Sequence, residues 1–384
     1  MKNVVKIKSD KIITQSGIFN GYVYLQNGKI IEVSKDNKPS DSFYDFTSFY
    51  VSPGFIDMHT HGAGGNGFLD CSAEQVINGC NHHLLHGTTS ILPTISAAPF
   101  NRMKDAVQSI KEAKDSHKTK NNIIGAHLEG PYLSAEQCGA QSPDYITKPI
   151  KQDYVELVNE FKGYIARWTF AAENDENGEF CKFITDSGII ASIGHSNATL
   201  KDVDMAIKNG CNLITHLYSC TSTVTRNFGF RSLGVIESAF LRDELFVEII
   251  ADGKHLPKEL VQMIIKIKSK EKVALITDSL EIAGTDVLEG VMAKTEFIVE
   301  DGVCKLKDRS AFAGSIATAD TLIKFMVNEA KASVEDAVYM LTQVPAQILK
   351  LNKGSINEGK DADITVFDEN INIKSVFVNG EKMA

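Results

Sequence analysis

The stretch that decides the fold is Val51-Ser52-Pro53-Gly54-Phe55-Ile56-Asp57-Met58-His59-Thr60-His61-Gly62. Residues 55–58, which are apolar apart from Asp57, follow the Pro-Gly break and precede Gly62, and this pattern predicts a short buried strand. Side chains two apart in a strand point to the same side, so His59 and His61 should project together from the strand's C-terminal end. Two imidazoles placed in this way can chelate a divalent metal ion.

Downstream of this stretch, short apolar runs alternate with helical segments, as expected for a parallel βα repeat. Seven further strands are predicted, at residues 88–94, 123–128, 168–172, 190–193, 213–215, 246–251 and 273–277. Together with residues 55–58 they make eight, the number that closes a (β/α)8 TIM barrel. Helices are predicted at residues 101–114, 202–209, 258–269, 320–331 and 334–341, and Asp301-Gly302 predicts a hairpin turn inserted after the eighth strand.

Both ends of the chain show the two-residue alternation of β-strands, with turn signals at Asn27-Gly28 and Asn379-Gly380. Isolated hairpins are only marginally stable, so we expect the two ends to share one sheet. The predicted organisation is a small β-sandwich domain from residues 1–52 and 350–384, and a (β/α)8 barrel catalytic domain from residues 53–349.

Composition limits the classes of partner that the protein could bind and indicates its cellular compartment. The net charge of −9 argues against nucleic acid and anionic membrane surfaces. No apolar run is long enough to span a bilayer, and residues 1–10 lack the apolar core of a signal peptide. The seven cysteines are odd in number and scattered, without a Cys-X-X-Cys motif, which argues against a disulfide framework. We therefore expect a cytoplasmic location.

Polar side chains gather where the predicted strands end, and in (β/α)8 barrels the chemistry lies at this end. The residues with ligand or acid–base chemistry directly after predicted strands are His59, His61, Glu129, His195, His216, Asp252, His255 and Asp278. The four histidines at positions 82, 83, 86 and 117 lie in or beside helical segments and are interpreted as structural. So many strand ends would hardly carry such residues by accident, and the pattern predicts a metal site.

Six motifs, in this order, resemble the N-acetylglucosamine-6-phosphate deacetylase family of the amidohydrolase superfamily. They are Pro53-Gly54-Phe55-Ile56-Asp57, His127-Leu128-Glu129-Gly130-Pro131, Gly194-His195-Ser196, Thr215-His216-Leu217-Tyr218, Ala251-Asp252-Gly253-Lys254-His255 and Thr277-Asp278. The resemblance implies one or two divalent ions per chain, zinc or iron, and a homodimer. The implied metal residues are Glu129, His195 and His216, a second pair His59 and His61 that shares Glu129, and the catalytic aspartate Asp278.

The resemblance also implies the reaction. Imidazole and carboxylate ligands leave the metal a position for water and lower the pKa of that water towards ~7. Asp278 would take the water proton as general base and pass it to the departing amine. The implied enzyme is a metal-dependent hydrolase whose small-molecule partner is an amino sugar phosphate. It would convert N-acetylglucosamine-6-phosphate and water into glucosamine-6-phosphate and acetate.

The substrate-binding positions depart from the family pattern. Gln141 stands where the family has a histidine, and Ser219 and Cys220 replace an asparagine and the residue after it. Arg226 or Arg231 would have to replace a family arginine that reaches the phosphate across a dimer interface. With His255, which matches a substrate-contacting histidine, these are the predicted substrate-binding residues. A related amidohydrolase acting on a different N-acyl sugar or other amide remains open.

Three further classes of protein are less consistent with the sequence. A cyclic amidase usually has a carboxylated lysine at the end of its fourth strand, and residues 168–174 contain none. A deaminase lacks the His-Leu-Glu-Gly-Pro motif. A non-enzymatic scaffold would be expected to have lost metal ligands, and none of the expected ones is missing.

Overall fold

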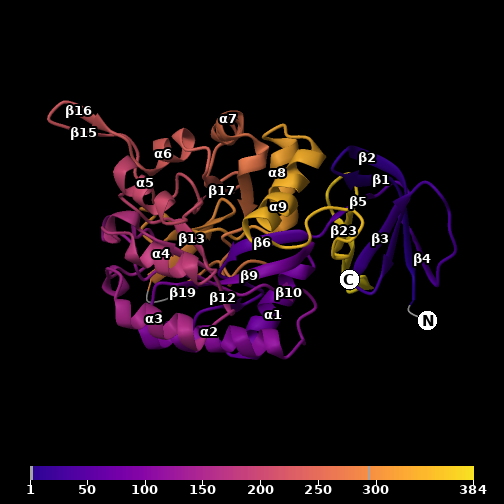
Figure 1. The fold of residues 1–384 in the computed structure, drawn as a ribbon, viewed down its shortest axis with the longest axis horizontal. Coiled ribbons are helices and arrows are strands. Elements are labelled where there is room, and N and C mark those ends of the chain that lie inside the picture. The colour runs from indigo at the N-terminus through magenta and orange to yellow at the C-terminus, as the bar shows by residue number, and fades with distance from the viewer. Residues whose placement is uncertain (1–2, 293–294) are drawn as a thin grey trace.

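The computed structural model describes residues 3–292 and 295–384, and its centre is a parallel β-barrel (Figure 1). The barrel strands, in their order around it, are β6 (Phe55–Thr60), β9 (Thr88–Ser96), β11 (Ala126–Glu129), β12 (Ile165–Phe170), β13 (Ile190–Ile193), β14 (Leu213–Ile214), β17 (Phe246–Ile250) and β18 (Val273–Ile276). The backbone N–H of Asp278 donates to the carbonyl of His59 at 2.9 Å, so the first and last strands meet. All eight predicted strands are confirmed.

Helices pack around the barrel and bury their apolar faces against it (Figure 1). They are α1 (Ala73–Leu84), α2 (Phe100–Asp115), α3 (Lys151–Glu160), α4 (Glu179–Asp186), α5 (Leu200–Lys208), α6 (Val235–Leu241), α7 (Lys258–Lys268), α8 (Ala319–Asn328) and α9 (Val334–Ile348). Short 3-10 turns occur at Ala135–Gln137, Pro143–Tyr145, Ala172–Asn174 and Lys270–Lys272.

Helix α9 is longer than predicted, because it continues through Pro345 to Ile348 instead of ending at residue 341. Proline lacks the N–H that the helix would use, which usually breaks a helix. Here Val344 and Ile348 are buried in a cluster with Met58 and Ile276 of the barrel strands, and this burial offsets the lost hydrogen bond. Packing of this kind is not visible in the local sequence pattern, and the predicted helix ended seven residues early.

The two ends of the chain form one sheet with its own core, which includes Ile12, Val51 and Phe377. Its strands are β1 (Val5–Thr14), β2 (Gly17–Gln26), β3 (Lys29–Ser34), β4 (Ser42–Asp45), β5 (Tyr50–Pro53), β23 (Ile364–Phe367), β24 (Ile373–Val378) and β25 (Glu381–Lys382). Strand β5 pairs with β1 on one side and β23 on the other, and so joins the two ends.

Small β elements are inserted between the barrel units. They are β7 (Gly62–Ala63) with β8 (Asn66–Gly67), β10 (Asn122–Ile123), the hairpin of β15 (Thr225–Asn227) and β16 (Phe230–Ser232), and a sheet of β19 (Glu289–Met292), β20 (Thr295–Glu300), β21 (Val303–Leu306) and β22 (Phe312–Gly314). The predicted turn at Asp301-Gly302 joins β20 to β21. Within the described residues, no helix has the length and apolar character needed to cross a membrane.

Candidate metal centre

Three predicted site residues sit on left-handed backbone directly after their strands. His195 has φ +47°, His216 φ +25° and Asp278 φ +47°. This conformation is uncommon for residues other than glycine and costs of order 1 kcal/mol or more at each position. Such local strain tends to cluster at functional sites, and here it turns three side chains toward a common centre.

Glu129 lies at that centre. Its Oε1 is 2.9 Å from Nε2 of His216, 3.1 Å from Nε2 of His195 and 3.4 Å from Nε2 of His59. Its Oε2 is 3.2 Å from Nε2 of His61. One carboxylate therefore contacts all four predicted histidine ligands, three through Oε1 and His61 through Oε2.

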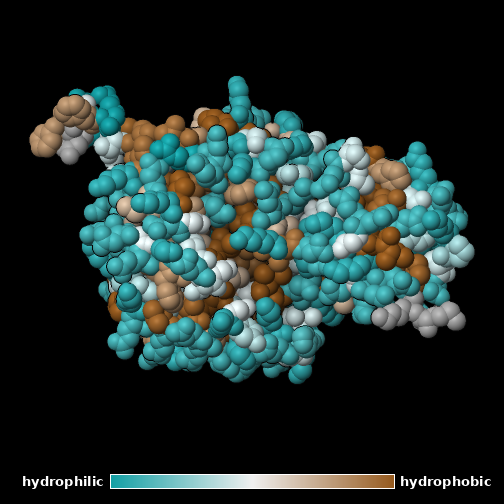
Figure 2. All heavy atoms as spheres, in the orientation of Figure 1, coloured by the Kyte–Doolittle hydropathy of each residue, from teal (hydrophilic) through white to brown (hydrophobic). Residues whose placement is uncertain are grey.

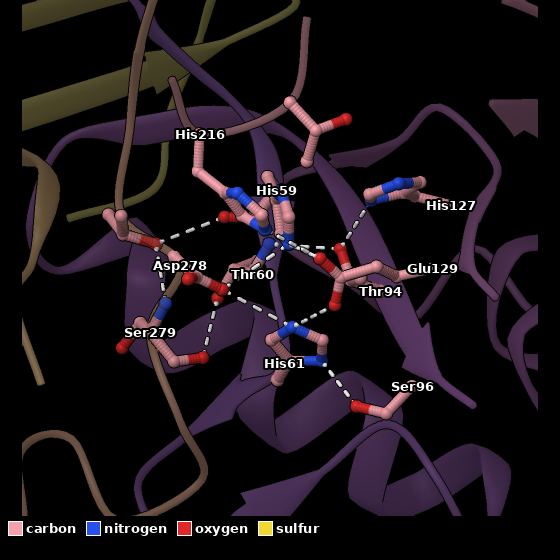
Figure 3. Close-up of polar contacts among 12 residues, drawn as sticks. His59, Thr60, His61, Thr94, Ser96, His127, Glu129, His216, Asp278 and Ser279 are labelled. Atoms are coloured by element: carbon pink, nitrogen blue, oxygen red, sulfur yellow. Dashed lines mark hydrogen bonds and ion pairs between the residues drawn. The ribbon is translucent and has the colours of Figure 1, made fainter. Parts of the chain in front are cut away.

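Asp278 faces Glu129 across the first-strand histidines (Figure 3). Its Oδ1 lies 3.3 Å from Nε2 of His59 and 3.3 Å from Nε2 of His61. All of these side chains are buried or nearly so. The structure thus brings together the six residues that the sequence predicted for the metal site and its general base.

The donor geometry fits divalent metal ions. Zinc–ligand bonds of about 2.0–2.1 Å imply about 3.3 Å between neighbouring donors of a tetrahedral site, close to the separations found here. Three overlapping groups of donors can each hold an ion: His59 with His216 and Asp278, His59 with His61 and Glu129, and Glu129 with His195 and His216. Both ring nitrogens of His59 are buried without a hydrogen-bond partner, so its Nε2 is free to bind a cation.

The electrostatics of the cluster also suit a cation. Burial opposes charge on the His59 ring, yet the carboxylates of Glu129 and Asp278 outweigh it and raise the pKa of His59 to about 10. Burial likewise opposes charge on Glu129, but the neighbouring His59 and His195 hold the pKa of Glu129 well below its usual range. Two carboxylates that draw protons onto imidazoles in this way would also attract a divalent ion.

Three of the four histidines are oriented by a neutral partner on their second ring nitrogen. Nδ1 of His61 lies 3.0 Å from the Ser96 hydroxyl. Nδ1 of His195 is 2.8 Å from the carbonyl of Gln137, and Nδ1 of His216 is 3.1 Å from the carbonyl of Ser219. A carbonyl can only accept, so the contacts of His195 and His216 place the proton on Nδ1 and leave Nε2 as the metal-binding nitrogen, whereas the Ser96 hydroxyl orients the His61 ring without fixing its tautomer.

Gln141 lies closer to this centre than the sequence suggested. Its Nε2 donates to Oε2 of Glu129 at 2.9 Å and comes within 3.4 Å of Nε2 of His195. Its Oε1 accepts from the backbone N–H of Ala97 at 2.7 Å. The family resemblance placed Gln141 only among the substrate contacts, and its hydrogen bond to the Glu129 carboxylate was not predicted.

A cavity of about 590 Å³ opens over the cluster. Gln141, Ser219, Cys220 and His255 line it, together with apolar residues of the β19–β22 sheet such as Phe312. Asp252 accepts from Nδ1 of His255 at 2.8 Å and so leaves the opposite ring nitrogen for a ligand. Four of the six predicted substrate residues are therefore at the cavity.

The two predicted arginines are not among the cavity-lining residues. Arg226 and Arg231 lie on the exposed β15–β16 hairpin, which projects away from the barrel (Figure 1). Their assignment as phosphate contacts stays a prediction.

A buried ion pair under the cluster was missed entirely. Arg167 and Glu248 lie inside the barrel, with no exposure to solvent. The signal was in the sequence, because each is the one charged residue within a mainly apolar strand, Ile165–Phe170 and Phe246–Ile250. Buried charges are rare unless they are paired, so one charged residue in each of two buried strands suggests that the two residues form an ion pair.

Comparison with known proteins identifies the family of the chain. Residues 50–383 match the amidohydrolase family. An N-acetylglucosamine-6-phosphate deacetylase from Haemophilus influenzae is 31% identical over 379 residues, which cover 96% of this chain and 97% of that protein. An N-acetylgalactosamine-6-phosphate deacetylase from Shewanella is 29% identical, with 88% of this chain and 84% of that protein covered. The crystal structure of N-acetylglucosamine-6-phosphate deacetylase from Pasteurella multocida superposes with a TM-score of 0.92 at 29% identity, over 99% of this chain and 100% of that one. The chain is thus a hydrolytic enzyme of the amidohydrolase family, and within it belongs to the N-acetylglucosamine-6-phosphate deacetylase family.

Proposed function

We propose that the protein is a metal-dependent deacetylase that removes the acetyl group from an N-acetyl amino sugar 6-phosphate, N-acetylglucosamine-6-phosphate being the first candidate. The observation that carries the proposal is the meeting of Glu129, four histidines and Asp278 at one cavity, which all of them except the fully buried His59 line. The names of the relatives support the substrate class. They also include the galacto epimer, so the configuration of the sugar at C4 is a question for the assay.

In this proposal Glu129, His195 and His216 hold one divalent ion, and His59, His61 and the shared Glu129 hold a second. The ligand set suits zinc or iron. Such an ion would polarise the acetamide carbonyl. It would also lower the pKa of the water that it binds, so that hydroxide is available near neutral pH.

The protein groups around the donors would complete the chemistry. The Asp278 carboxylate borders the first-strand histidines at 3.3 Å and can accept a proton from water, then return it to the departing amine. Gln141 is held by Ala97 and Glu129 on the cavity wall, where its amide can donate to a substrate oxygen. His255, fixed by Asp252, can contact a sugar hydroxyl. Ser219 and Cys220 would border the sugar at the same cavity.

The phosphate would be bound by Arg226 or Arg231 of a neighbouring subunit. The two residues pair directly across the β15–β16 hairpin. Like charges in this position repel each other, which is unfavourable unless an anion lies close by. An arginine fork matches the geometry of a phosphate group.

The hairpin's apolar tip supports a homodimer. Phe228 is 97% exposed and Phe230 is 79% exposed. Figure 2 shows this tip as a hydrophobic group that stands clear of the remaining surface at the upper left. Aromatic side chains this exposed on a projecting arm are typical of residues that another chain covers. We infer that the arm packs on a second copy and brings its arginines to that copy's cavity.

A reducing, cytoplasmic location also belongs to the proposal. It is supported by the cysteines, all seven of which are free thiols in the structure.

The decisive experiment measures acetate release by metal-loaded protein. The substrates are N-acetylglucosamine, N-acetylgalactosamine and N-acetylmannosamine, each with and without a 6-phosphate. We expect acetate release to be fastest from a phosphorylated sugar. The comparison of the gluco and galacto compounds then determines which configuration at C4 the enzyme prefers. The absence of acetate from every compound would refute the deacetylase assignment and favour an amidohydrolase acting on another amide.

A further inference from the structure

The buried pair Arg167 and Glu248 connects the barrel interior to the metal centre. Arg167 donates to both carboxylate oxygens of Glu248, with Nη2 2.8 Å from Oε2. The remaining N–H groups of the guanidinium reach Ser192 Oγ at 3.0 Å, the carbonyl of Met58 at 3.2 Å and Thr215 Oγ1 at 2.8 Å. Every donor of the arginine therefore has an acceptor, and the guanidinium is locked in place.

Glu248, held by this arginine, points its Oε2 at the one histidine of the centre that lacks a partner. Oε2 lies 3.6 Å from Nδ1 of His59 and 3.4 Å from the backbone N–H of His216. Whereas the other three histidines have a hydroxyl or carbonyl behind the ring, His59 has a carboxylate. A slight rotation of the His59 ring would bring Nδ1–H within hydrogen-bond reach of Oε2.

A role in stability alone explains this arrangement poorly. Buried ion pairs contribute little net stability, since the desolvation of two charges cancels most of their attraction. Apolar residues of similar size would fill the barrel interior equally well. A carboxylate behind a metal-binding imidazole, in contrast, fixes its tautomer and raises the basicity of the other nitrogen.

We propose that Glu248 is a positioning residue for His59: it accepts Nδ1–H, aims Nε2 at Glu129 and Asp278, and so strengthens divalent-ion binding on the His59–His61 side of the centre. Arg167 acts behind it, by neutralising Glu248 and holding its orientation. This inference rests on the two-ion centre proposed above. It predicts that binding of the ion on the His59–His61 side depends on Glu248, whereas binding of the ion held by His195 and His216 does not.

The test uses the full chain stripped of metal and titrated with Zn²⁺ or Co²⁺, with binding followed by calorimetry and by the Co²⁺ absorption spectrum. Two backgrounds isolate the two positions. His195→Ala leaves the His59–His61 position, and His59→Ala leaves the His195–His216 position. Glu248→Gln is then added to each, because glutamine keeps the shape and removes the charge.

We expect Glu248→Gln to weaken binding about 10- to 100-fold in the His195→Ala background. In the His59→Ala background it should change binding by less than about threefold, because the ring that it positions is already gone. The double replacement Arg167→Met with Glu248→Gln leaves no uncompensated buried charge, and it should reproduce the result if the single variant folds poorly. Thermal unfolding of the metal-free chains establishes that each variant is folded.

Asp363→Asn is the matched control. It removes the charge of another buried ion pair, in which Asp363 lies 2.6 Å from Lys353, at the terminal sheet rather than under the metal centre. It should lower stability without changing either metal affinity. Equal loss of affinity in both backgrounds after Glu248→Gln, or loss in neither, would overturn the positioning role.

A His195→Ala chain that binds no metal would overturn both the two-ion centre and this inference. Acetate release by the wild-type protein would still stand in that case, so the proposed reaction and the present inference can fail separately.

Discussion

Replacement of the hairpin arginines tests how the protein would recognise a phosphate. If the proposed role is right, Arg226→Ala or Arg231→Ala removes a charge-assisted contact to the phosphate, which is worth about 1.5–3 kcal/mol. That corresponds to roughly 10- to 150-fold in kcat/KM for the phosphorylated sugar, with little effect on the unphosphorylated one. Because each change also relieves repulsion between two arginines that face each other across the hairpin, thermal stability should not fall.

The assay compares kcat/KM on each sugar with and without its 6-phosphate. Arg309→Ala serves as the control for charge, since Arg309 is exposed and pairs with Glu300 on the inserted sheet. It should keep the full preference for the phosphate, whereas the hairpin variants should lose most of it.

Mixed dimers show whether the arginine acts from the neighbouring subunit. A chain with Arg231→Ala is unfolded, mixed with an equal amount of an Asp278→Asn chain and refolded. In a two-fold dimer, half of the assemblies are hybrids with one intact site each, so about a quarter of wild-type activity should return. If the arginine acts within its own chain, the mixture gives only the mean of the two variants. Equal rates on phosphorylated and unphosphorylated sugars in the wild type would refute the phosphate reasoning altogether.

Three further outcomes are expected. Asp278→Asn should lower turnover by ~10²–10⁴ with metal content nearly unchanged, and a variant that kept most of its activity would assign the base to another residue. Elemental analysis of protein purified without chelator should find more than one transition metal per chain, and a constant single equivalent under metal-replete conditions would contradict the two-ion centre. Burial raises the pKa of Asp320, but hydrogen bonds from His86, Thr318 and Lys324 outweigh it and lower that pKa to about 2. The stabilisation is therefore present above the unfolded pKa and lost as the pH falls from about 4 to 2, so Asp320→Asn should cost about 2 kcal/mol at pH 7 by chemical denaturation. The prediction would be contradicted if Asp320→Asn and the wild type differed in free energy of unfolding by as much at pH 3 as at pH 7.

The barrel was predictable because its strands are buried on both faces. The strand Ile190–Ile193 was predicted with the bounds that the structure has, since a short apolar run between turn signals has few other interpretations. The meeting of the candidate metal ligands was predictable for a related reason. Parallel strands present their C-terminal ends at one rim, so residues such as Glu129 and His216 converge there although they are 87 positions apart.

The side chains inside the barrel were not predictable in the same way. Arg167 on β12 and Glu248 on β17 come from strands that are not neighbours in the sheet, and only closure of the barrel places them opposite each other. Gln141 lies in a loop, whose path depends on contacts such as the one with Ala97 rather than on periodicity. Sequence patterns describe elements singly, whereas these contacts arise from how the elements enclose a common space.

The terminal sheet has a consequence for the order of folding during synthesis. Ser52 on β5 bonds to Thr365 on β23, a partner that follows 313 residues later in the chain. At about 5–20 residues per second, the ribosome needs roughly 15 to 60 s to supply that partner. Throughout this interval β5 offers an unpaired edge, and Val51 lacks the part of its cluster that comes from the C-terminal strands, such as Val366 and Phe377. The first strands to emerge are thus among the last to be completed.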